Sequence, residues 1–509
     1  MNPKALKRLH ERLCLLRAYP QNASELATAQ RGLAGFHRRA DTKRAAAALA
    51  DTGIAGTPIH YRFFWPMARW LSHRYPALLT IDWTEGEFAE RLVAVLPLLV
   101  PAAEAEALRR AALPAREAID RLRAPRETDA TFLVRRIEAL PGGDAVREAT
   151  HDALDVAYRL EGSADGPSRT HAFFDDAPRA FRTGAPRRDR PDLATELRVP
   201  PRAVRALATR DGKRLVDLAR CAMVTRSRDL DAFAHGDPRD VRMVDDGDGL
   251  AFALIGVVPE RRLFLPAVYG ALTLRNGVPI GYVQLDVLFG NAEVSYNTFE
   301  TFRGGEAGFV FCRLLAAVRH VFGVTNFSIE PYQLGRGNEE GIASGAWWFY
   351  ARFGFRPRDP KVSRLARLEL GKRARDPAYR SNRRALLRLA SAHVFWSPDG
   401  KGSGVITPSV AIGFALARHK KPAPAAGRLH GPSVTSWTAD ERLWWKRWAP
   451  LVARLPGLWR WSPKERRALV RVVRAKGGRR ESEYARLFDA HPRLAAAVLA
   501  LGGRLTLVS

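Results

Sequence analysis

Residues 272–355 read LTLRNGVPIGYVQLDVLFGNAEVSYNTFETFRGGEAGFVFCRLLAAVRHVFGVTNFSIEPYQLGRGNEEGIASGAWWFYARFGF, and this stretch decides the fold. Asn276-Gly277 is a dipeptide typical of a two-residue hairpin turn, and Phe289-Gly290-Asn291 predicts a second turn. Apolar residues alternate with polar ones around these turns, which is the pattern of half-buried strands. The sequence therefore predicts three adjacent antiparallel strands.

The third strand leads into a glycine-rich loop, Arg303-Gly304-Gly305-Glu306-Ala307-Gly308, which opens a helix expected over residues 307–322. A strand over 326–330 and a helix over 342–353 are expected to follow. Glycine allows the backbone to approach a ligand closely, and the first N–H groups of a helix have no partner inside the helix. The loop is therefore a candidate phosphate-binding loop.

The order of these elements, over about residues 212–358, resembles the GNAT N-acetyltransferase superfamily. Ala346 and Tyr350 stand at the spacing of that family's A-x-x-x-Y-x-x-x-G-F pattern. Ala343 occupies the place of the family's usual asparagine, and Asn338 lies further upstream. The resemblance implies an α/β fold with a GNAT-like mixed, mostly antiparallel sheet flanked by helices.

In that family the loop follows Q/R-x-x-G-x-G/A, and its amides hold the pyrophosphate of acetyl-coenzyme A at the N-terminus of the helix. The chain matches this pattern in part, in a register that starts at Arg303 or in one that starts at Phe302. A carboxylate at Glu306 would repel a pyrophosphate unless it points away. The residues that the resemblance assigns to the pyrophosphate are Arg303, Gly304, Gly305, Ala307 and Gly308.

The resemblance also assigns Tyr350 the role of protonating the departing thiolate of coenzyme A. A phenol with a pKa of about 10 suits this role. The alternative is that Tyr350 is one more core aromatic beside Trp347, Trp348 and Phe349.

The strand before the loop is expected to supply a general base. Glu293, Ser295 and Asn297 alternate onto one of its faces, so Glu293 is the first choice and Glu300, nearer the loop, is the second. The alternative is that Glu293 is a solvated edge carboxylate. Glu330, at the end of the following strand, either lines the slot for the acyl donor or caps that strand.

Five segments are predicted along the chain. They are a helical domain over 1–160, a loop-rich linker over 161–211, a GNAT-like domain over 212–400, a second linker over 401–432, and a basic, tryptophan-rich helical domain over 433–509. An edge strand is expected at residues 392–396, because residues 364–389 look helical where the family usually has a strand hairpin. The tryptophans of the last domain are expected to form a small core with a charged rim, with base stacking or a membrane interface as the alternatives.

The chain has 509 residues and a formal net charge of +29. Such a charge attracts polyanions, so nucleic acid is a candidate partner. Arginine outnumbers lysine 70 to 12, however, and compositional drift in a GC-rich genome also explains much of the charge. The three cysteines lie far apart, and the apolar stretch 92–103 is too short to span a bilayer. These features predict a cytoplasmic protein without a transmembrane segment or metal site.

Three functions remain open from the sequence. The first is an acyltransferase that moves an acyl group, with acetyl expected, from coenzyme A to an amine acceptor. The second is a non-catalytic GNAT-like module in a nucleic-acid-binding protein. The third is a transferase whose acyl or aminoacyl group arrives on a carrier such as a charged tRNA. The sequence identifies neither the acceptor nor the oligomeric state.

Overall fold

The computed structural model describes residues 1–84, 87–184, 191–304, 306–400, 412–414, 416, 429 and 436–503. They form two compact units. Unit 1 consists of Met1–Thr183, Val216–His235 and Arg275–Pro279, and unit 2 consists of Gly184–Leu215, Gly236–Leu274 and Ile280–Ser509. The C-terminal helices, expected as a domain of their own, thus belong to the same unit as the large sheet. The expected linker over 401–432 lies almost wholly outside the described residues.

The framework of unit 2 is a nine-stranded sheet with the strand order β11-β12-β10-β9-β8-β7-β6-β5-β4. Its strands are β4 (Ala203–Ala206), β5 (Gly236–Gly247), β6 (Leu250–Val257), β7 (Ala267–Arg275), β8 (Val278–Leu288), β9 (Asn291–Thr298), β10 (Asn326–Ile329), β11 (Arg356–Pro357) and β12 (Val394–Trp396). Among the described registers, β9 with β10 is parallel and the others are antiparallel. The expectation of a mixed, mostly antiparallel sheet flanked by helices is confirmed.

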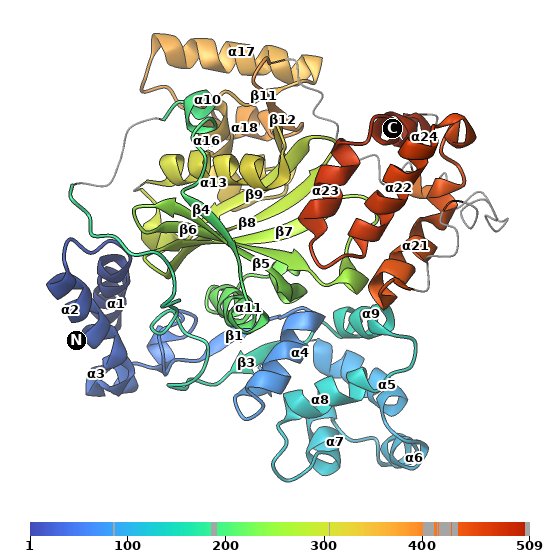
Figure 1. The fold of residues 1–509 in the computed structure, drawn as a ribbon. Coiled ribbons are helices and arrows are strands. Elements are labelled where there is room, and N and C mark those ends of the chain that lie inside the picture. Colours follow the sequence, from blue (N-terminus) through green and yellow to red (C-terminus); the bar gives the residue numbers. More distant parts are fainter. Residues whose placement is uncertain are drawn as a thin grey trace. The chain divides into compact units, whose positions relative to one another are not determined.

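The residues of the turn between β7 and β8 explain the hairpin that these two strands form at the centre of the sheet. Asn276 and Gly277 both have positive φ, 49° and 79°, as a two-residue hairpin between right-twisted strands requires. Helix α13 (Ala307–Phe322) connects β9 to β10 and lies along one face of the sheet (Figure 1). It ends at Gly323, whose φ of 78° closes the last turn in the left-handed conformation.

The helix expected over residues 342–353 is instead two short helices. These are α15 (Glu339–Ser344) and α16 (Ala346–Ala351), which follow α14 (Pro331–Leu334). Gly345 separates them with a left-handed φ of 65°, so the helix cannot continue through it. The aromatic residues Trp347 to Tyr350 therefore lie on a helix of their own, separate from α15.

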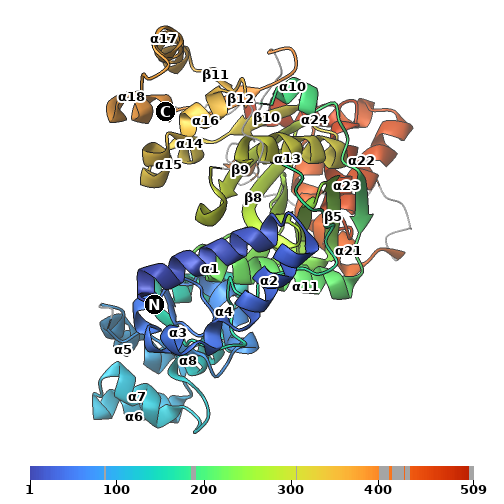
Figure 2. The same ribbon diagram turned by 90° about the vertical axis from the view of Figure 1, so that its left-hand side faces the viewer.

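A strand is present where residues 392–396 were expected to supply the sheet edge, and it is β12. It is the second strand of the sheet and not the edge, because it pairs with β10 on one side and with the short edge strand β11 on the other. Helices α17 (Pro360–Arg375) and α18 (Arg383–Leu389) are inserted in the chain between β11 and β12 and lie beside them (Figure 2).

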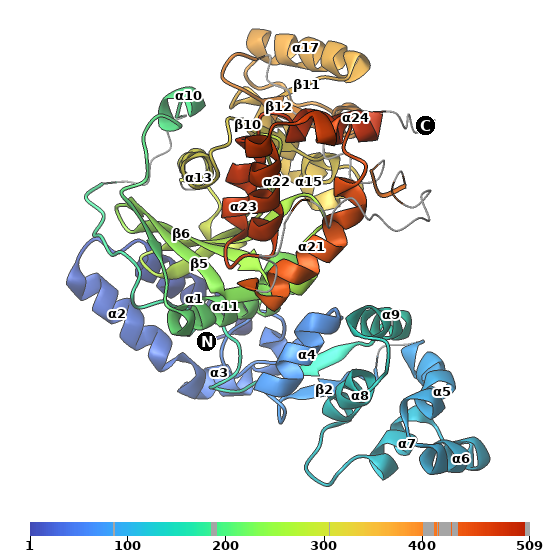
Figure 3. The same cartoon turned by 45° about the vertical axis from the view of Figure 1, so that its right-hand side comes forward.

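Four helices end the described chain, and α22 and α23 lie side by side (Figure 3). They are α21 (Ala439–Val452), α22 (Pro463–Lys476), α23 (Glu481–Asp489) and α24 (Leu494–Gly503). Capping boxes at Thr438 and Ser462 start α21 and α22. The short helix α10 (Leu193–Glu196) also belongs to unit 2.

Residues 1–160 were expected to form a helical domain, and they lie in unit 1. The main helices of unit 1 are α1 (Pro3–Ala18), α2 (Ala23–Ala34), α4 (Trp65–Arg74), α5 (Phe88–Leu99), α6 (Ala102–Ala111), α7 (Ala115–Leu122), α8 (Asp129–Glu138), α9 (Asp144–Leu154) and α12 (Asp231–Ala234). Helix α11 (Thr209–Val224) begins in unit 2 and ends in unit 1. Unit 1 also holds a small antiparallel sheet in the order β1-β3-β2, formed by Ile59–Tyr61, Tyr158–Leu160 and Leu79–Ile81. Strands of three residues are too short to show an alternating pattern, so the sequence did not reveal them. No helix among the described residues has the length and apolar character needed to cross a membrane.

Candidate functional site

Four strands of unit 2 carry polar side chains on one face. The register of β8 and β9 places Asp286 opposite Glu293 and Gln284 opposite Ser295. Side chains at opposed positions share a face of the sheet. These side chains are half-buried, whereas every residue of β7 is buried. We call the set Gln284, Asp286, Glu293, Ser295, Glu330 and His393 the polar face.

Direct contacts hold the polar face together. His393 Nε2 lies 3.1 Å from Glu293 Oε2. Ser295 Oγ donates a hydrogen bond of 3.2 Å to Glu330 Oε1, and Gln284 Nε2 donates one of 3.3 Å to Asp286 Oδ1. Glu293, predicted from the alternation of its strand, is therefore part of a polar cluster and not an isolated edge carboxylate.

Asp286 is the carboxyl group of this cluster that titrates near neutrality. Burial above all, and then the nearby negative charge of Glu293, raise its pKa to about 7, although the hydrogen bond from Gln284 acts to lower it. The charge of Glu330 also contributes to the rise. A carboxyl group with this pKa exchanges protons readily at physiological pH, which suits a general base or acid.

Tyr350 lies deep in α16, with 3% of its surface exposed. Its ring packs against Phe311, Phe349 and Phe355, as expected of a core aromatic. Burial raises the pKa of Tyr350, so the phenol stays protonated at neutral pH. On the pKa of its hydroxyl, the charge of Glu330 acts to raise the value and the backbone of Tyr296 on β9 acts to lower it.

Two strands separate in the region of Tyr350. The parallel pairing of β9 with β10 covers Asn291–Glu293 against Asn326–Ser328, while β9 continues to Thr298. Tyr296, beyond the pairing, lies on the unpaired part of β9, and its backbone acts on the pKa of Tyr350. The charge of Glu330, which bonds Ser295 in the same region, also raises the pKa of Tyr350. Tyr350 and the polar face thus meet where β9 and β10 separate.

The predicted phosphate loop has two residues whose roles differ from expectation. The Arg303 side chain donates to Thr298 O at 2.9 Å and to Glu340 Oε1 at 2.6 Å, so it ties the loop to α15. A Cβ on Gly308 would lie 3.1 Å from the Phe353 ring, so this glycine permits close packing of α13 against the end of α16. Gly305 lies outside the described residues.

The other loop residues lie at the start of α13. Gly304 has a left-handed φ of 87°, which favours glycine there. The carbonyl of Ala307 accepts a hydrogen bond of 3.2 Å from the Tyr296 hydroxyl. Glu306 occupies the N-cap position and is buried, with 7% of its surface exposed. A buried carboxylate at this end of the helix dipole weakens the attraction for a second anion.

The remaining sequence candidates lie away from the polar face. Glu300 is exposed in the turn before the loop, and Ala343 is exposed on α15. Asn338 caps α15, because its Oδ1 accepts a hydrogen bond of 3.0 Å from the Gly341 backbone. Asn338 therefore does not replace the asparagine that the family pattern places at residue 343.

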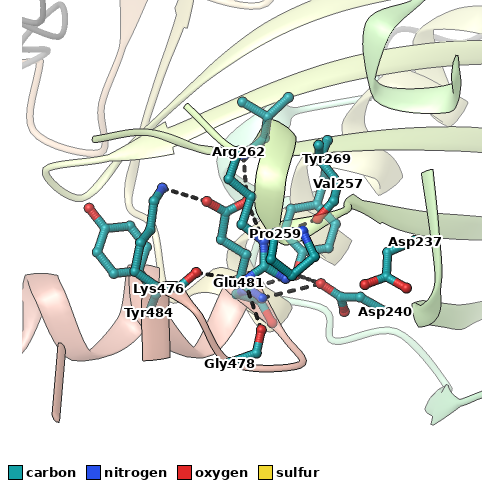
Figure 4. A network of polar contacts seen from close by, with 12 residues as sticks. Asp237, Asp240, Val257, Pro259, Arg262, Tyr269, Lys476, Gly478, Glu481 and Tyr484 are labelled. Atoms are coloured by element: carbon teal, nitrogen blue, oxygen red, sulfur yellow. Dashed lines mark hydrogen bonds and ion pairs between the residues drawn. The ribbon is translucent and has the colours of Figure 1, made fainter. Parts of the chain in front are cut away.

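A second cluster of titratable groups in unit 2 is completely buried (Figure 4). Lys476 and Glu481 form an ion pair with no exposed side-chain surface, and Lys476 Nζ also donates to Pro266 O at 2.8 Å. Arg262 donates to the carbonyls of Val257, Lys476 and Gly478 at 2.6–3.1 Å. Burial lowers the pKa of Lys476 to about 8 despite the neighbouring carboxylate.

This cluster connects α22 and α23 to the sheet. Asp240 on β5 accepts hydrogen bonds from the Tyr269 hydroxyl at 2.5 Å and from the Glu481 backbone at 3.2 Å. The Tyr269 hydroxyl in turn accepts a hydrogen bond of 2.8 Å from the Ser482 backbone. Within the described residues, Asp240 Oδ1 and the Ser482 hydroxyl have no hydrogen-bond partner. Because the other groups bond one another without solvent access, we assign the cluster a structural role.

Five of the six C-terminal tryptophans are buried, and Trp459, with 51% of its surface exposed, is the exception. Trp444 and Trp448 are 1% and 0% exposed, and their indole N–H groups donate to the carbonyls of Pro259 and Phe264 at 2.9 and 3.0 Å. They are therefore unavailable for stacking on bases or for insertion into a membrane interface, which agrees with the expected core.

Within the described ranges, no three His, Cys, Asp or Glu side chains are arranged to hold a metal ion. Comparisons with models of protein families, with curated proteins and with solved structures gave no match to the chain.

Proposed function

We propose that the chain is a GNAT-like acyltransferase that moves an acyl group, acetyl in the first instance, from coenzyme A to an amine. The observation that carries this proposal is the meeting of Tyr350, Glu330 and Ser295 with Glu293 and His393 where β9 separates from β10. A proton acceptor and a proton donor on either side of such a gap are what acyl transfer to an amine requires.

The charge of the polar face favours a cationic acceptor. Asp286, Glu293 and Glu330 place three carboxyl groups close together in a chain whose net charge is +29. A protonated amine is attracted to this face and must lose a proton before its nitrogen can attack. Glu293, supported by His393, accepts that proton, and Asp286 shares it near neutral pH.

An acyl thioester supplies an activated carbonyl, whose C–S bond breaks as the C–N bond to the amine forms. Tyr350 donates its phenolic proton to the departing thiolate. It regains, through solvent, the second proton that the nitrogen loses as the amide forms. The first turn of α13 supplies positive potential for the donor's phosphates, and the Arg352 guanidinium, which would lie 3.5 Å from a Cβ on Gly308, adds to it. Gly304 and Ala307 would hold the phosphates through their backbone, together with Gly305 and Gly308.

Glu306 is the feature that disagrees with coenzyme A. Its buried position at the N-cap favours a second candidate, in which the acyl or aminoacyl group arrives on another carrier and the loop does not bind pyrophosphate. The chemistry at the polar face is the same in both candidates, so the test must address the loop separately.

Calorimetric titration with acetyl-coenzyme A tests the proposal. The wild-type protein is expected to release heat with a dissociation constant below millimolar. A folded protein that gives no heat at millimolar ligand would contradict coenzyme A as the donor. If heat appears only in Glu306→Gly, the natural loop has turned away from coenzyme A, which supports the carrier-bound donor.

A further inference from the structure

Helices α17 and α18 and the segment that joins them carry a concentrated positive charge. Residues 359–389 contain ten Lys or Arg and three Asp or Glu, a net of +7 over 31 residues, whereas the whole chain has +29 over 509. The charge per residue is thus about four times the average of the chain. We call residues 359–389 the basic arm.

The charge lies on the solvent side of the arm. Helix α17 packs inward through Val362, Ala366 and Glu369, which are buried. Arg364, Arg367 and Arg375 are exposed and recur at helical spacing on the opposite side. Gly371 lies between them, with little but the end of Arg375 near its missing Cβ. A glycine inside a helix costs about 1 kcal/mol relative to alanine, and here it places no side chain between the arginines.

Most of these cations lack an acidic partner. Within the described ranges, ion pairs of the arm's cations join Lys372 to Glu369 and Arg383 to Glu339. The described chain provides no ion pair for the exposed side chains of Lys361, Arg364, Arg367, Arg375, Arg380, Arg384 and Arg388. Uncompensated cations aligned along a helix repel one another, so a polyanion that neutralises them binds favourably.

The structure argues against two other partners for this surface. A membrane helix needs an apolar face directed outward, but α17 buries Val362 and Ala366 on the protein, and Leu368 is the one large apolar side chain of this helix that is strongly exposed. Single-stranded nucleic acid needs exposed aromatic side chains for base stacking. In the arm's surroundings, Tyr379 donates to Glu369 at 2.8 Å and Trp348 is covered by the Arg373 guanidinium at 4.7 Å.

We propose that the basic arm binds the phosphate backbone of double-stranded DNA without sequence preference. The stripe from Arg364 to Arg375 extends over about 16 Å at 1.5 Å per residue, which spans several phosphates of one strand. The major groove of B-DNA, about 12 Å wide, admits a helix, whereas the narrow major groove of A-form RNA does not. Binding would bring the duplex close to β12, whose neighbour His393 belongs to the polar face.

The test is fluorescence anisotropy of a labelled duplex of random sequence with the full chain over a salt series. The wild type is expected to bind with a steep salt dependence. The triple variant Arg364→Ala, Arg367→Ala and Arg375→Ala should bind more weakly, and its log–log salt slope should be smaller by about 3, since each lost phosphate contact removes about 0.9. Lysine at the same three positions should restore binding.

A matched triple variant in unit 1 controls for net charge. Arg109, Arg116 and Arg126 are also exposed and have no ion pair among the described residues, and their replacement by alanine should leave the slope unchanged. Equal weakening by both triple variants would overturn the proposal, because the whole surface would then bind diffusely. Absence of binding at low salt would overturn it too, as would equal or tighter binding of duplex RNA, single strands, polyglutamate or anionic vesicles. None of these outcomes bears on acyl transfer, which is assayed without DNA.

Discussion

At the scale of single residues, Asp286 sets the pH range of the chemistry that we propose, because it shares the proton that Glu293 accepts from the amine. It titrates near neutrality because burial and the charge of Glu293 both oppose its ionisation. It is also the residue for which function and stability are expected to conflict, since its ionised form is useful for catalysis and unfavourable for folding.

The rate of acyl transfer is expected to rise with pH through about 7, because the base must lose its proton to act. In Asp286→Asn this rise near pH 7 should disappear from the profile of kcat/KM. A profile unchanged in the variant would show that Asp286 takes no part in the transfer.

The same substitution is expected to stabilise the fold at high pH. Between the ordinary pKa of 3.8 and about 7, the folded state binds more protons at Asp286 than the unfolded state, so stability falls as pH rises. Asp286→Asn removes this loss. Its melting temperature should therefore exceed that of the wild type at pH 8 and approach it near pH 4. A variant that is less stable at both pH values would contradict the assignment.

Glu306 is the residue that decides the donor. If its buried carboxylate weakens anion binding at the start of α13, then Glu306→Gln should raise the affinity for coenzyme A by about tenfold, the equivalent of 1.4 kcal/mol. Competition against a fluorescent coenzyme A analogue measures this change. Glu300→Gln, which removes an exposed carboxylate just before the loop, is the matched control and should change the affinity little.

At the scale of elements, the buried cluster of Lys476, Glu481, Arg262 and Asp240 attaches α22 and α23 to the sheet. Lys476→Met keeps the volume of the side chain and leaves Glu481 buried with one cation fewer. Breaking a buried pair in this way is expected to lower the free energy of unfolding by about 3–5 kcal/mol. Lys464→Met, on the exposed side of the same helix, should change it by less than about 0.5 kcal/mol. Urea unfolding measures both, and similar values for the two variants would refute the structural role.

The helices and strands that the sequence predicted are those that form because of neighbouring residues in the chain. The strands β7 to β9 follow from the Asn276-Gly277 turn and from alternation, and α13 was placed at its observed bounds from its glycine boundaries. The break at Gly345 was missed because glycine is often tolerated inside a helix. The three-residue strands of unit 1 offered no pattern to detect.

Of the site residues, the sequence could predict only those whose positions follow from the pattern of their own strand. Glu293 could be found from alternation within β9. His393 could not, because its position depends on the insertion of α17 and α18 before β12 and on the pairing of β12 with β10. Asp286 shares a face with Glu293 through a register that the turn at Phe289 sets, but its depth depends on surrounding packing. The Lys476 cluster joins residues more than 200 positions apart, which no local pattern reveals.

At the scale of the whole molecule, buried histidines make unit 1 sensitive to acid. Burial lowers the pKa of His151 to about 4 and that of His10 well below its usual value. Between these values and 6.5 the unfolded chain binds more protons, so stability is lost as pH falls through this window. For His151 the loss is about 3 kcal/mol, at 1.36 kcal/mol for each pKa unit.

His151→Gln should show a smaller fall in stability between pH 6.5 and pH 4 than the wild type. The amide keeps a partner for the Tyr158 hydroxyl, which lies 2.9 Å from His151 Nε2. His73→Gln, at an exposed position on α4, serves as the control and should retain most of the wild-type dependence. Chemical denaturation at several pH values measures the difference, and parallel curves for His151→Gln and wild type would contradict the prediction.

The most direct test of the proposed acyltransferase is release of free thiol from acetyl-coenzyme A in the presence of a polyamine such as spermidine. The wild type is expected to release thiol only when both substrates are present. Glu293→Gln and Tyr350→Phe should each reduce kcat by about 10²–10⁴-fold while the fold is retained. Amine-independent release, or rates unchanged in both variants, would contradict the account.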